Sequence, residues 1–253
     1  MLRPKRIVVV GSGRLAEALL SSPALAHHRH VELAARNRER LEQLRAEYHC
    51  LPYDANDTHE AVVLLCVNDG ALAETASAFG HIAKVMVHFS GTSALIEAER
   101  FDSAVMWPVH SFGEIEKPSW TQIPWITEHR GTEAGLFVAD FLAALGCTSV
   151  ELNVQQRREL HLAAVVMNNF SNHLATLAFE WCAKQGLPPT ALQHLAEQTF
   201  SRLRFTAPEA AQTGPARRGD TSTLEQHLNM LNENPQLREI YQMFSKQIAE
   251  RYL

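Results

Sequence analysis

The sequence predicts an α/β fold in which a doubly wound parallel sheet is followed by an all-helical C-terminal domain. First, short apolar runs alternate with helical patterns through the first half of the chain, which is typical of a parallel sheet covered by helices. Second, a glycine turn near the start of the sequence joins the first apolar run to a helix. Third, a long helical pattern begins at Gln155, and no strand candidate follows residue 152. We therefore expect one domain over residues 1–152 and a second over residues 153–253.

The glycine turn follows a strand expected at residues 7–10, Ile-Val-Val-Val. Such a β-branched run suits a central strand that is buried on both faces. In the motif Gly11-x-Gly13-x-x-Ala16, Gly11 permits a tight turn, Gly13 lets a phosphate approach the backbone, and Ala16 lets the helix pack closely. Together with the N–H groups of the helix N-terminus, this Rossmann-like turn is predicted to bind the pyrophosphate of a dinucleotide. Alternatively, the same turn binds nothing. The predicted contact residues are Gly11, Ser12, Gly13, Arg14 and Leu15.

Strands and helices continue to alternate up to residue 152. Further strands are expected at residues 31–35, 61–67, 84–89, 104–107, 124–127 and 148–152. Helices are expected at residues 38–48, 69–79 and 132–145. Because ligands of such sheets bind beyond the carboxyl ends of the strands, the segments after each strand are the places to look for a site.

The end of the second strand indicates which dinucleotide binds. An NAD-binding unit usually has an acidic residue there, which binds the ribose 2′-hydroxyl. Here the residues are Arg36, Asn37 and Arg38, without a carboxylate. A guanidinium can bind a phosphate through two hydrogen bonds, so these residues favour NADP(H) as the cofactor. Alternatively, the arginines are solvated charges at the start of a helix.

Two later strand ends complete the predicted cofactor site. Val67, Asn68 and Asp69 stand at the end of one strand, where the second half of the cofactor would lie. Ser90 and Gly91 follow the next strand, and we expect their loop to approach the nicotinamide. Alternatively, Asp69 only caps the helix that begins there.

Histidines and asparagines are the candidate catalytic groups. His110 lies in an unusual turn and is predicted to donate a proton or to orient the substrate; alternatively, it only orders its loop. His161 lies on the helix expected at residues 155–184. Asn168 follows it by seven residues, so the two share a face within about 20°, and Asn169 lies beside that face. His161 is predicted to protonate a carbonyl or imine as hydride arrives, or else to be a structural histidine at a domain interface.

Three more helices are expected after that one. They are at residues 190–204, 221–231 and 235–252, with a loop at 207–219. The small residues and arginines of this loop suit a site for an anionic substrate. Arg218, Asp220 and His227 are the candidate residues there. Alternatively, Asp220 caps the helix that follows and the arginines are exposed.

The composition is that of an ordinary soluble protein, with 46% hydrophobic and 20% charged residues among 253. The net charge of −5 argues against nucleic-acid binding, which usually needs a basic face. Because no apolar run is long enough for a membrane span or a signal peptide, we expect no membrane partner and a cytoplasmic location. The four cysteines are far apart, and we interpret the His27-His28-x-His30 cluster as a surface loop, so no metal site is expected.

Taken together, these motifs resemble a family in which a Rossmann-like domain precedes a helical domain named domain of unknown function 2520. Its members are described as NADP-dependent oxidoreductases. The resemblance covers nearly the whole chain, through residues 11–16, 107–112, 161–169 and 214–220 with His227. More distantly, the layout is similar to pyrroline-5-carboxylate reductase, ketopantoate reductase and the β-hydroxyacid dehydrogenases.

The resemblance implies an NADP(H)-dependent oxidoreductase that reduces a small, anionic carbonyl or imine substrate in a cleft between its domains. It also implies a homodimer formed through the helical domain, as in many of those relatives. β-Hydroxyacid dehydrogenases use a lysine on the long helix, whereas this helix has His161 and no lysine before Lys184. Their specific mechanism is therefore not expected here. The alternative function is a non-catalytic NADP(H)-binding sensor or interaction protein.

Overall fold

The computed structural model describes residues 6–113 and 118–253, and the chain forms two compact units. We name Met1–Val165 the sheet unit and Val166–Leu253 the helical unit. All strands of the described residues belong to the sheet unit.

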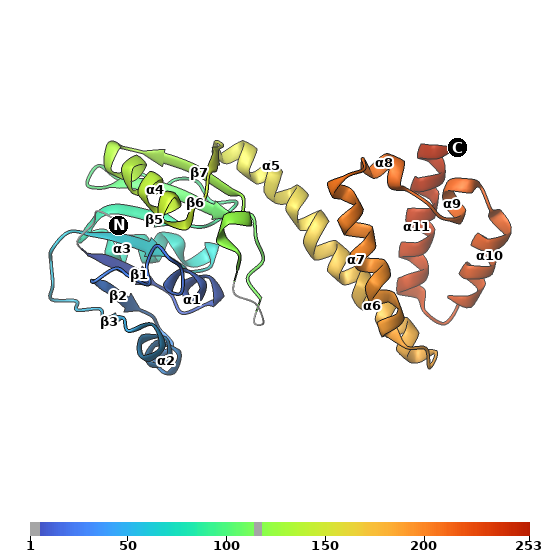
Figure 1. The fold of residues 1–253 in the computed structure, drawn as a ribbon, viewed down its shortest axis with the longest axis horizontal. Coiled ribbons are helices and arrows are strands. Elements are labelled where there is room, and N and C mark those ends of the chain that lie inside the picture. Colours follow the sequence, from blue (N-terminus) through green and yellow to red (C-terminus); the bar gives the residue numbers. More distant parts are fainter. Residues whose placement is uncertain (1–5, 114–117) are drawn as a thin grey trace. The chain divides into compact units, whose positions relative to one another are not determined.

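Among the described residues, the sheet has eight strands in the order β3-β2-β1-β4-β5-β6-β7-β8 (Figure 1). The strands are β1 (Ile7–Val10), β2 (Val31–Ala34), β3 (Leu51–Pro52), β4 (Ala61–Leu65), β5 (Ala83–His88), β6 (Asp102–Pro108), β7 (Trp125–Arg130) and β8 (Ser149–Glu151). The α-helices of this unit are α1 (Arg14–Leu20), α2 (Arg38–Tyr48), α3 (Leu72–Phe79), α4 (Thr132–Leu145) and α5 (Val154–Val165). β1 lies between β2 and β4, with Ile7 paired to Val31 on one side and to Val62 on the other. The strand order reverses at this point, and ligands of doubly wound sheets bind at such a reversal.

The two faces of the sheet pack against different helices. Ile7 and Val9 belong to a core that includes residues of α1, α2 and α4. Val8 and Val10 belong to a second core with Leu72 of α3. Successive side chains of a strand point to opposite faces, so the β-branched run of β1 is buried on both sides, as the sequence predicts. The predicted fold class is confirmed.

One strand pair corrects the prediction of a parallel sheet, because β7 is antiparallel to β6. A parallel pair needs a long crossover connection, usually an α-helix. The described part of the connection from β6 to β7 contains only a 3₁₀ turn, Trp120–Gln122. The chain therefore returns directly, and α4 then carries it to β8, which is parallel to β7. The two-residue strand β3 was not predicted, since it is too short to show an apolar period.

The first part of the long helical region packs on the sheet. Leu160 and Ala164 of α5 contact a cluster made by Val105, Trp107 and Ile126. The sheet unit therefore continues past the domain boundary that the sequence places after residue 152, and that boundary stays a prediction.

Beyond α5 the helical pattern changes its geometry. A π-helical turn spans Val166–Phe170, and α6 (Ser171–Lys184) follows. A π-helix has more residues per turn than an α-helix. The sequence predicts that His161 and Asn168 share a face from α-helical spacing that this π turn interrupts, and the shared face stays a prediction.

The helical unit continues with α7 (Gln193–Ser201), α8 (Pro208–Ala211), α9 (Pro215–Arg218), α10 (Thr221–Met230) and α11 (Pro235–Tyr252). The segment expected as a loop at residues 207–219 holds the short helices α8 and α9. Each of them begins at a proline, which is favoured at the first helical position. Among the described residues, no helix combines the length and the apolar character that a membrane crossing requires.

Candidate functional site

A groove of about 590 Å³ opens at the carboxyl ends of β1, β2 and β4. The predicted cofactor residues that line it are Gly11, Ser12, Gly13, Arg36, Asn37, Val67 and Asn68. Its other wall comes from α3 and includes Glu74, Thr75, Ala78 and Phe79. The structure thus brings together three segments that are far apart in the sequence, at the edge of the sheet where the sequence predicts a nucleotide.

The glycine turn after β1 is shaped by close packing on one side and open space on the other. Gly11 has φ 130°, and a Cβ there would collide with the carbonyl group of Cys66. At Gly13 no atom lies within 4 Å of the place where a Cβ would stand. Gly13 is the N-cap of α1, and no side chain caps this helix. Gly11 therefore fixes the turn, and the space in front of Gly13 lets a ligand approach the main chain. Arg14 and Leu15 begin α1, and their cofactor contacts stay predictions.

The three residues after β2 have different surroundings. The Asn37 side chain accepts a hydrogen bond from the N–H of Arg40 at 3.0 Å and so caps α2. Arg40 in turn pairs with Glu17 of α1 at 2.5 Å. Arg38 is exposed in the first turn of α2 and does not line the groove. Arg36 lines the groove, and within residues 6–113 and 118–253 it has no ion-pair partner. Of the two arginines, Arg36 is therefore the one that lines the groove, and its binding of a phosphate stays a prediction.

Asp69 is not the helix cap that the sequence left open as its alternative role. The residue that caps the next turn is Asn68, whose side chain accepts from the N–H of Ala71 at 3.2 Å. The carboxylate of Asp69 instead accepts hydrogen bonds from the hydroxyls of Ser90 at 2.8 Å and Thr92 at 2.7 Å. Asp69 thus connects the end of β4 to the loop after β5.

That loop, residues 90–93, is also ordered by buried polar groups. The Ser90 hydroxyl accepts the N–H groups of Thr92 at 3.1 Å and Ser93 at 2.9 Å. The ring of His88 accepts the N–H of Ser90 at 3.2 Å and donates to the carbonyl of Ala94 at 3.0 Å. Burial lowers the pKa of His88 to about 4, so the ring is neutral at pH 7. The loop that the sequence places near the nicotinamide is therefore held by hydrogen bonds of Ser90 and His88.

The other side of this loop contacts α5. The ring of His161 packs against Trp107 with centroids 5.5 Å apart. A Cβ added to Gly91 would lie 2.6 Å from Cδ2 of His161 and 2.9 Å from Cε2 of Trp107. Gly91 is thus required by the close approach of these two rings. His161, predicted as a proton donor, lies directly beside the predicted nicotinamide loop.

His110 lies in different surroundings. Its side chain is exposed and contacts the ring of Phe112, with centroids 4.9 Å apart. Phe112 packs against the core that includes α1 and α4. This contact fits the alternative of a loop-ordering histidine, and the catalytic role of His110 stays a prediction.

The candidate residues of the helical unit lie around the start of α10, farther along α10 and in the π turn. Asp220 caps α10 by accepting from the N–H of Thr223 at 3.1 Å and from its hydroxyl at 2.7 Å, and these bonds lower the pKa of Asp220. Arg218 ends α9, and His227 shares a hydrogen bond of 2.8 Å with the Tyr241 hydroxyl of α11. Asn169 is exposed in the π turn. Their part in catalysis stays a prediction.

Two residues beside the site were missed from the sequence. Arg157 is fully buried and binds Glu128 and the loop after β5. His88 was seen only as the end of a strand. Arg157 could have been singled out as a charged residue on an apolar helix face. Its partners could not, because they are distant in the sequence.

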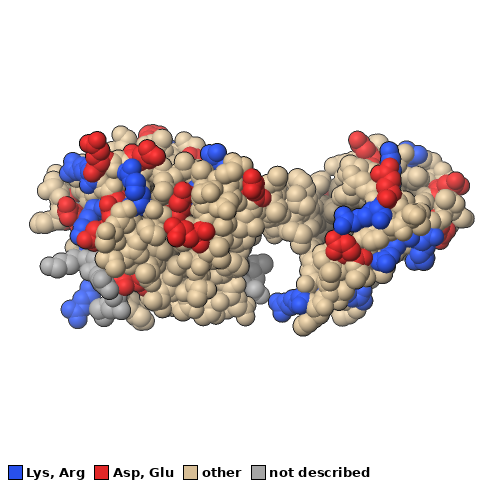
Figure 2. Space-filling view, turned by 90° about the horizontal axis from the view of Figure 1, so that it is seen from above, with Lys and Arg blue, Asp and Glu red and all other residues tan. Residues whose placement is uncertain are grey.

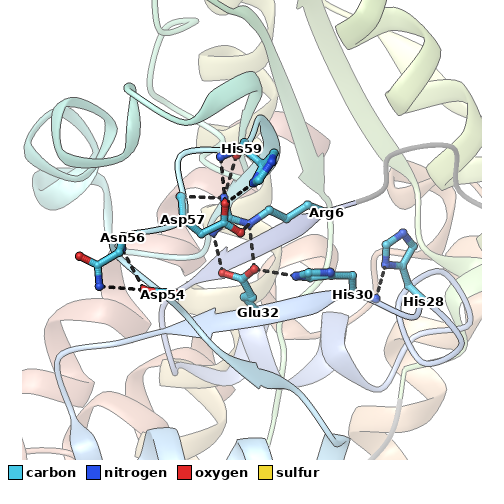
Figure 3. Close-up of polar contacts among 8 residues, drawn as sticks. All are labelled: Arg6, His28, His30, Glu32, Asp54, Asn56, Asp57 and His59. Atoms are coloured by element: carbon cyan, nitrogen blue, oxygen red, sulfur yellow. Dashed lines mark hydrogen bonds and ion pairs between the residues drawn. The ribbon is translucent and has the colours of Figure 1, made fainter.

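The opposite edge of the sheet holds a second polar cluster (Figure 3). Arg6 binds both carboxylate oxygens of Glu32 at 2.8 Å, and it donates to the carbonyls of Asp57 at 3.1 Å and His59 at 2.7 Å. His30 also contacts Glu32 at 2.8 Å. Burial alone would raise the pKa of Glu32, but the hydrogen bonds from Arg6 and His30 outweigh it and lower the pKa. This cluster lies at the amino ends of β1 and β2, and the described residues contain no group of three or more His, Cys, Asp or Glu that could hold a metal.

The charged surface is mixed in sign. Figure 2 shows acidic and basic side chains intermixed on the visible face of each unit, with wide uncharged areas between them. This distribution agrees with the small net charge of −5.

Two family matches cover most of the chain. Residues 6–88 match the family described as NADP oxidoreductase, coenzyme F420-dependent. Residues 123–248 match domain of unknown function DUF2520. These matches confirm the resemblance drawn from the sequence, and NADP(H), the cofactor expected there, is the one that the first description names. A comparison with curated proteins found no match.

Solved structures share the fold along nearly the whole chain. An inferred NADP oxidoreductase from Bacteroides fragilis is 28% identical, with a TM-score of 0.84 over 97% of this chain and 98% of that one. A protein from Thermotoga maritima is 24% identical, with a TM-score of 0.67 over 96% and 97%. A 1-pyrroline-5-carboxylate reductase from Streptococcus pyogenes is 13% identical, with a TM-score of 0.57 over 97% and 98%. The last two show likeness of fold alone.

Proposed function

We propose that this chain, which joins an NADP oxidoreductase domain to a DUF2520 domain, binds NADP(H) and uses it to reduce a small carbonyl or imine substrate. The observation that carries the proposal is the groove at the ends of β1, β2 and β4. Its walls combine the glycine turn with Arg36, the arginine that replaces the usual acidic residue.

The charge at the end of β2 supports NADP(H) over NAD(H). The 2′-phosphate of NADP is the feature that separates the two cofactors, and Arg36 supplies a guanidinium for it. A carboxylate at this position would repel that phosphate, and the residues after β2 are Ala35, Arg36 and Asn37. The open space at Gly13 gives the pyrophosphate access to the main chain.

The reduction itself is assigned to the loop after β5 and to His161. NADPH held in the groove by the glycine turn and Arg36 would supply the hydride for the electrophilic carbon of the substrate. His161 donates the proton to the carbonyl oxygen or imine nitrogen, so an alcohol or amine results. The contact of His161 with Gly91 and Trp107 supports this role, because it places the imidazole beside the loop assigned to the nicotinamide. His110 is the second candidate donor.

We further assign substrate binding to the helical unit. Arg218 would bind an anionic group of the substrate, and Asn169 would orient it by hydrogen bonding. Asp220 and His227, engaged by Thr223 and Tyr241, would shape the site. This assignment rests on the charges and amides of these residues.

We also propose a homodimer that forms through the helical unit. Many large apolar side chains of this unit are exposed, which is unusual for the surface of a monomer. The most exposed are Phe170, Leu195, Phe205, Met230 and Leu253. The four cysteines are free thiols, which supports a reducing compartment such as the cytoplasm.

Calorimetric titration with NADPH and NADH tests the cofactor assignment. We expect NADPH to bind more tightly, and Arg36→Ala to weaken NADPH binding about 10- to 100-fold with little effect on NADH, since a hydrogen bond to a charged group contributes roughly 1.5–3 kcal/mol. Arg38→Ala is the matched control and should change affinity much less, because Arg38 lies outside the groove. Tighter binding of NADH by the unmodified protein would contradict the assignment.

Transfer of a labelled hydride from NADPH tests the reaction. We expect transfer to at least one member of a carbonyl and imine panel, with His161→Ala reducing the rate on that substrate. Binding of NADPH without transfer across the panel would favour the non-catalytic sensor instead. Full turnover by the His161 variant would exclude its role as acid.

A further inference from the structure

Arg157 of α5 is a buried cation that connects three elements. Its side chain is fully buried. One terminal nitrogen of its guanidinium donates to the carboxylate of Glu128 on β7, and the other donates to the carbonyl of Ser93. The adjacent Arg158 donates to the carbonyl of Thr92 at 2.7 Å. Helix α5 is thus bound to the loop at residues 90–93 by two consecutive arginines.

The same loop is held from the opposite side by Asp69, which accepts from the hydroxyls of Ser90 and Thr92. Asp69 follows β4, whereas Arg157 reaches the loop from α5. The position of the loop is therefore set by polar contacts both from Asp69 after β4 and from α5. Of the two anchors, Arg157 is the one shielded from solvent.

His161 lies four residues after Arg157, so both side chains are on one face of α5. Both contact the loop region: Arg157 binds Ser93, and the ring of His161 closes on Gly91. Since a Cβ at Gly91 would stand only 2.6 Å from the His161 ring, a shift of α5 by a fraction of an ångström changes this gap.

We infer that Arg157 is a positioning residue for hydride transfer: it sets both the loop that receives the nicotinamide and the place of His161 beside it. The inference rests on the proposed function. A role in stability alone explains the residue poorly, because a buried ion pair can often be replaced by apolar side chains at little cost to the fold. The specific gain from the guanidinium is the geometry of two bonds to different elements.

The test compares NADPH with 2′-phospho-ADP-ribose, a fragment that lacks the nicotinamide, by calorimetric titration of the whole chain. Arg157→Met should weaken NADPH binding about tenfold, because a misplaced loop loses the nicotinamide contacts, and should leave the fragment unchanged. Arg157→Lys keeps the charge without the two-pronged geometry and should show a smaller loss of the same kind. The lysine variant also tests the inference if the methionine variant does not fold.

Arg6→Met is the matched control. Arg6 is also a buried arginine that pairs with a glutamate and donates to backbone carbonyls, but at the opposite edge of the sheet (Figure 3). We expect Arg6→Met to change the affinities for both ligands by the same factor. Unchanged NADPH binding in both Arg157 variants, an equal loss for both ligands, or the same selective loss in Arg6→Met would overturn the inference. If the unmodified protein binds neither ligand, the proposed function itself fails, and the inference fails with it.

Discussion

At the scale of single residues, the site depends on two glycines for different reasons. Gly11 turns the chain with a positive φ of 130°, which is visible in the motif itself. Gly91 is required because the rings of His161 and Trp107 approach it. Only the first of these requirements is local, and the sequence predicts only the first.

Replacement of Gly91 by alanine should disturb the site. The added Cβ would lie 2.6 Å from His161 and 2.9 Å from Trp107, so one ring must move or the helix must shift. We expect a loss of about 1–3 kcal/mol in the free energy of unfolding, measured by urea denaturation, since overpacking usually costs that much. Gly70→Ala is the control, because nothing lies within 4 Å of a Cβ at that position. Equal stability of the Gly91 and Gly70 variants would contradict the contact.

Residue types alone did not show which of two nearby residues has a given role. Arg36 and Arg38 are equivalent by type, but the groove includes only Arg36. Asn68 and Asp69 are both suitable caps, and the cap is Asn68. In each pair the decision depends on which way the backbone directs the side chain.

At the scale of elements, the loop after β5 carries a buried titratable group. His88 is 1% exposed, and Arg157, Asp69 and Glu128 are the charged groups that act on it. Burial is the largest effect and lowers the pKa of His88 from 6.5 to about 4. The neutral ring accepts from Ser90 through Nδ1 and donates to Ala94 through Nε2, so protonation of Nδ1 breaks the hydrogen bond from Ser90.

This lowered pKa predicts a loss of stability in mild acid. An unfolded histidine binds a proton below about pH 6.5, whereas folded His88 does so only near pH 4. The unfolded state therefore binds more protons between these values, and stability should fall by roughly 3 kcal/mol as the pH drops through that range. Urea denaturation at several pH values should show this slope in the unmodified protein and a smaller one in His88→Gln.

The pH range in which stability is lost distinguishes His88 from the carboxylates. Glu32, whose pKa is lowered, loses its stabilising charge only below its usual value of 4.5. The assignment to His88 would be contradicted if stability fell only below pH 4.5. In that case the unmodified protein and His88→Gln would have the same dependence of stability on pH above 4.5.

Most elements could be predicted from the sequence, because strong local patterns form them. The helices at Arg38–Tyr48, Thr132–Leu145 and Pro235–Tyr252 have the predicted bounds. The direction of β7 and the π turn at Val166–Phe170 could not be predicted. Strand direction depends on where the connection returns to the sheet, and a π turn depends on how a helix fits its neighbours.

At the scale of the whole molecule, the helical unit exposes apolar side chains at the end of α7. Phe200, Leu203 and Phe205 are 47%, 38% and 87% exposed. A surface of this kind usually belongs to an interface between subunits. It supports the proposed homodimer.

Light scattering after size-exclusion chromatography should give the mass of a dimer for the unmodified chain. Phe205→Asp should shift this mass toward that of the monomer, because a carboxylate cannot be buried in an apolar interface without a large cost. NADPH affinity should remain, since the groove lies in the sheet unit. Gln198→Asp, a change at an exposed polar position of α7, is the control. A monomer at tens of micromolar for the unmodified chain would contradict the proposal.

The sequence by itself determined the strand, the glycine turn and the arginine that follows the second strand, because each is a local pattern with a local physical reason. It also determined the order of the two domains, since periodicity changes along the chain. Only the tertiary structure decided that Gly91 packs closely against His161 and that Asp69 and Arg157 hold the same loop. It also decided that β7 is antiparallel to β6. These facts join residues tens of positions apart, and such pairs meet only when the sheet and its helices have packed.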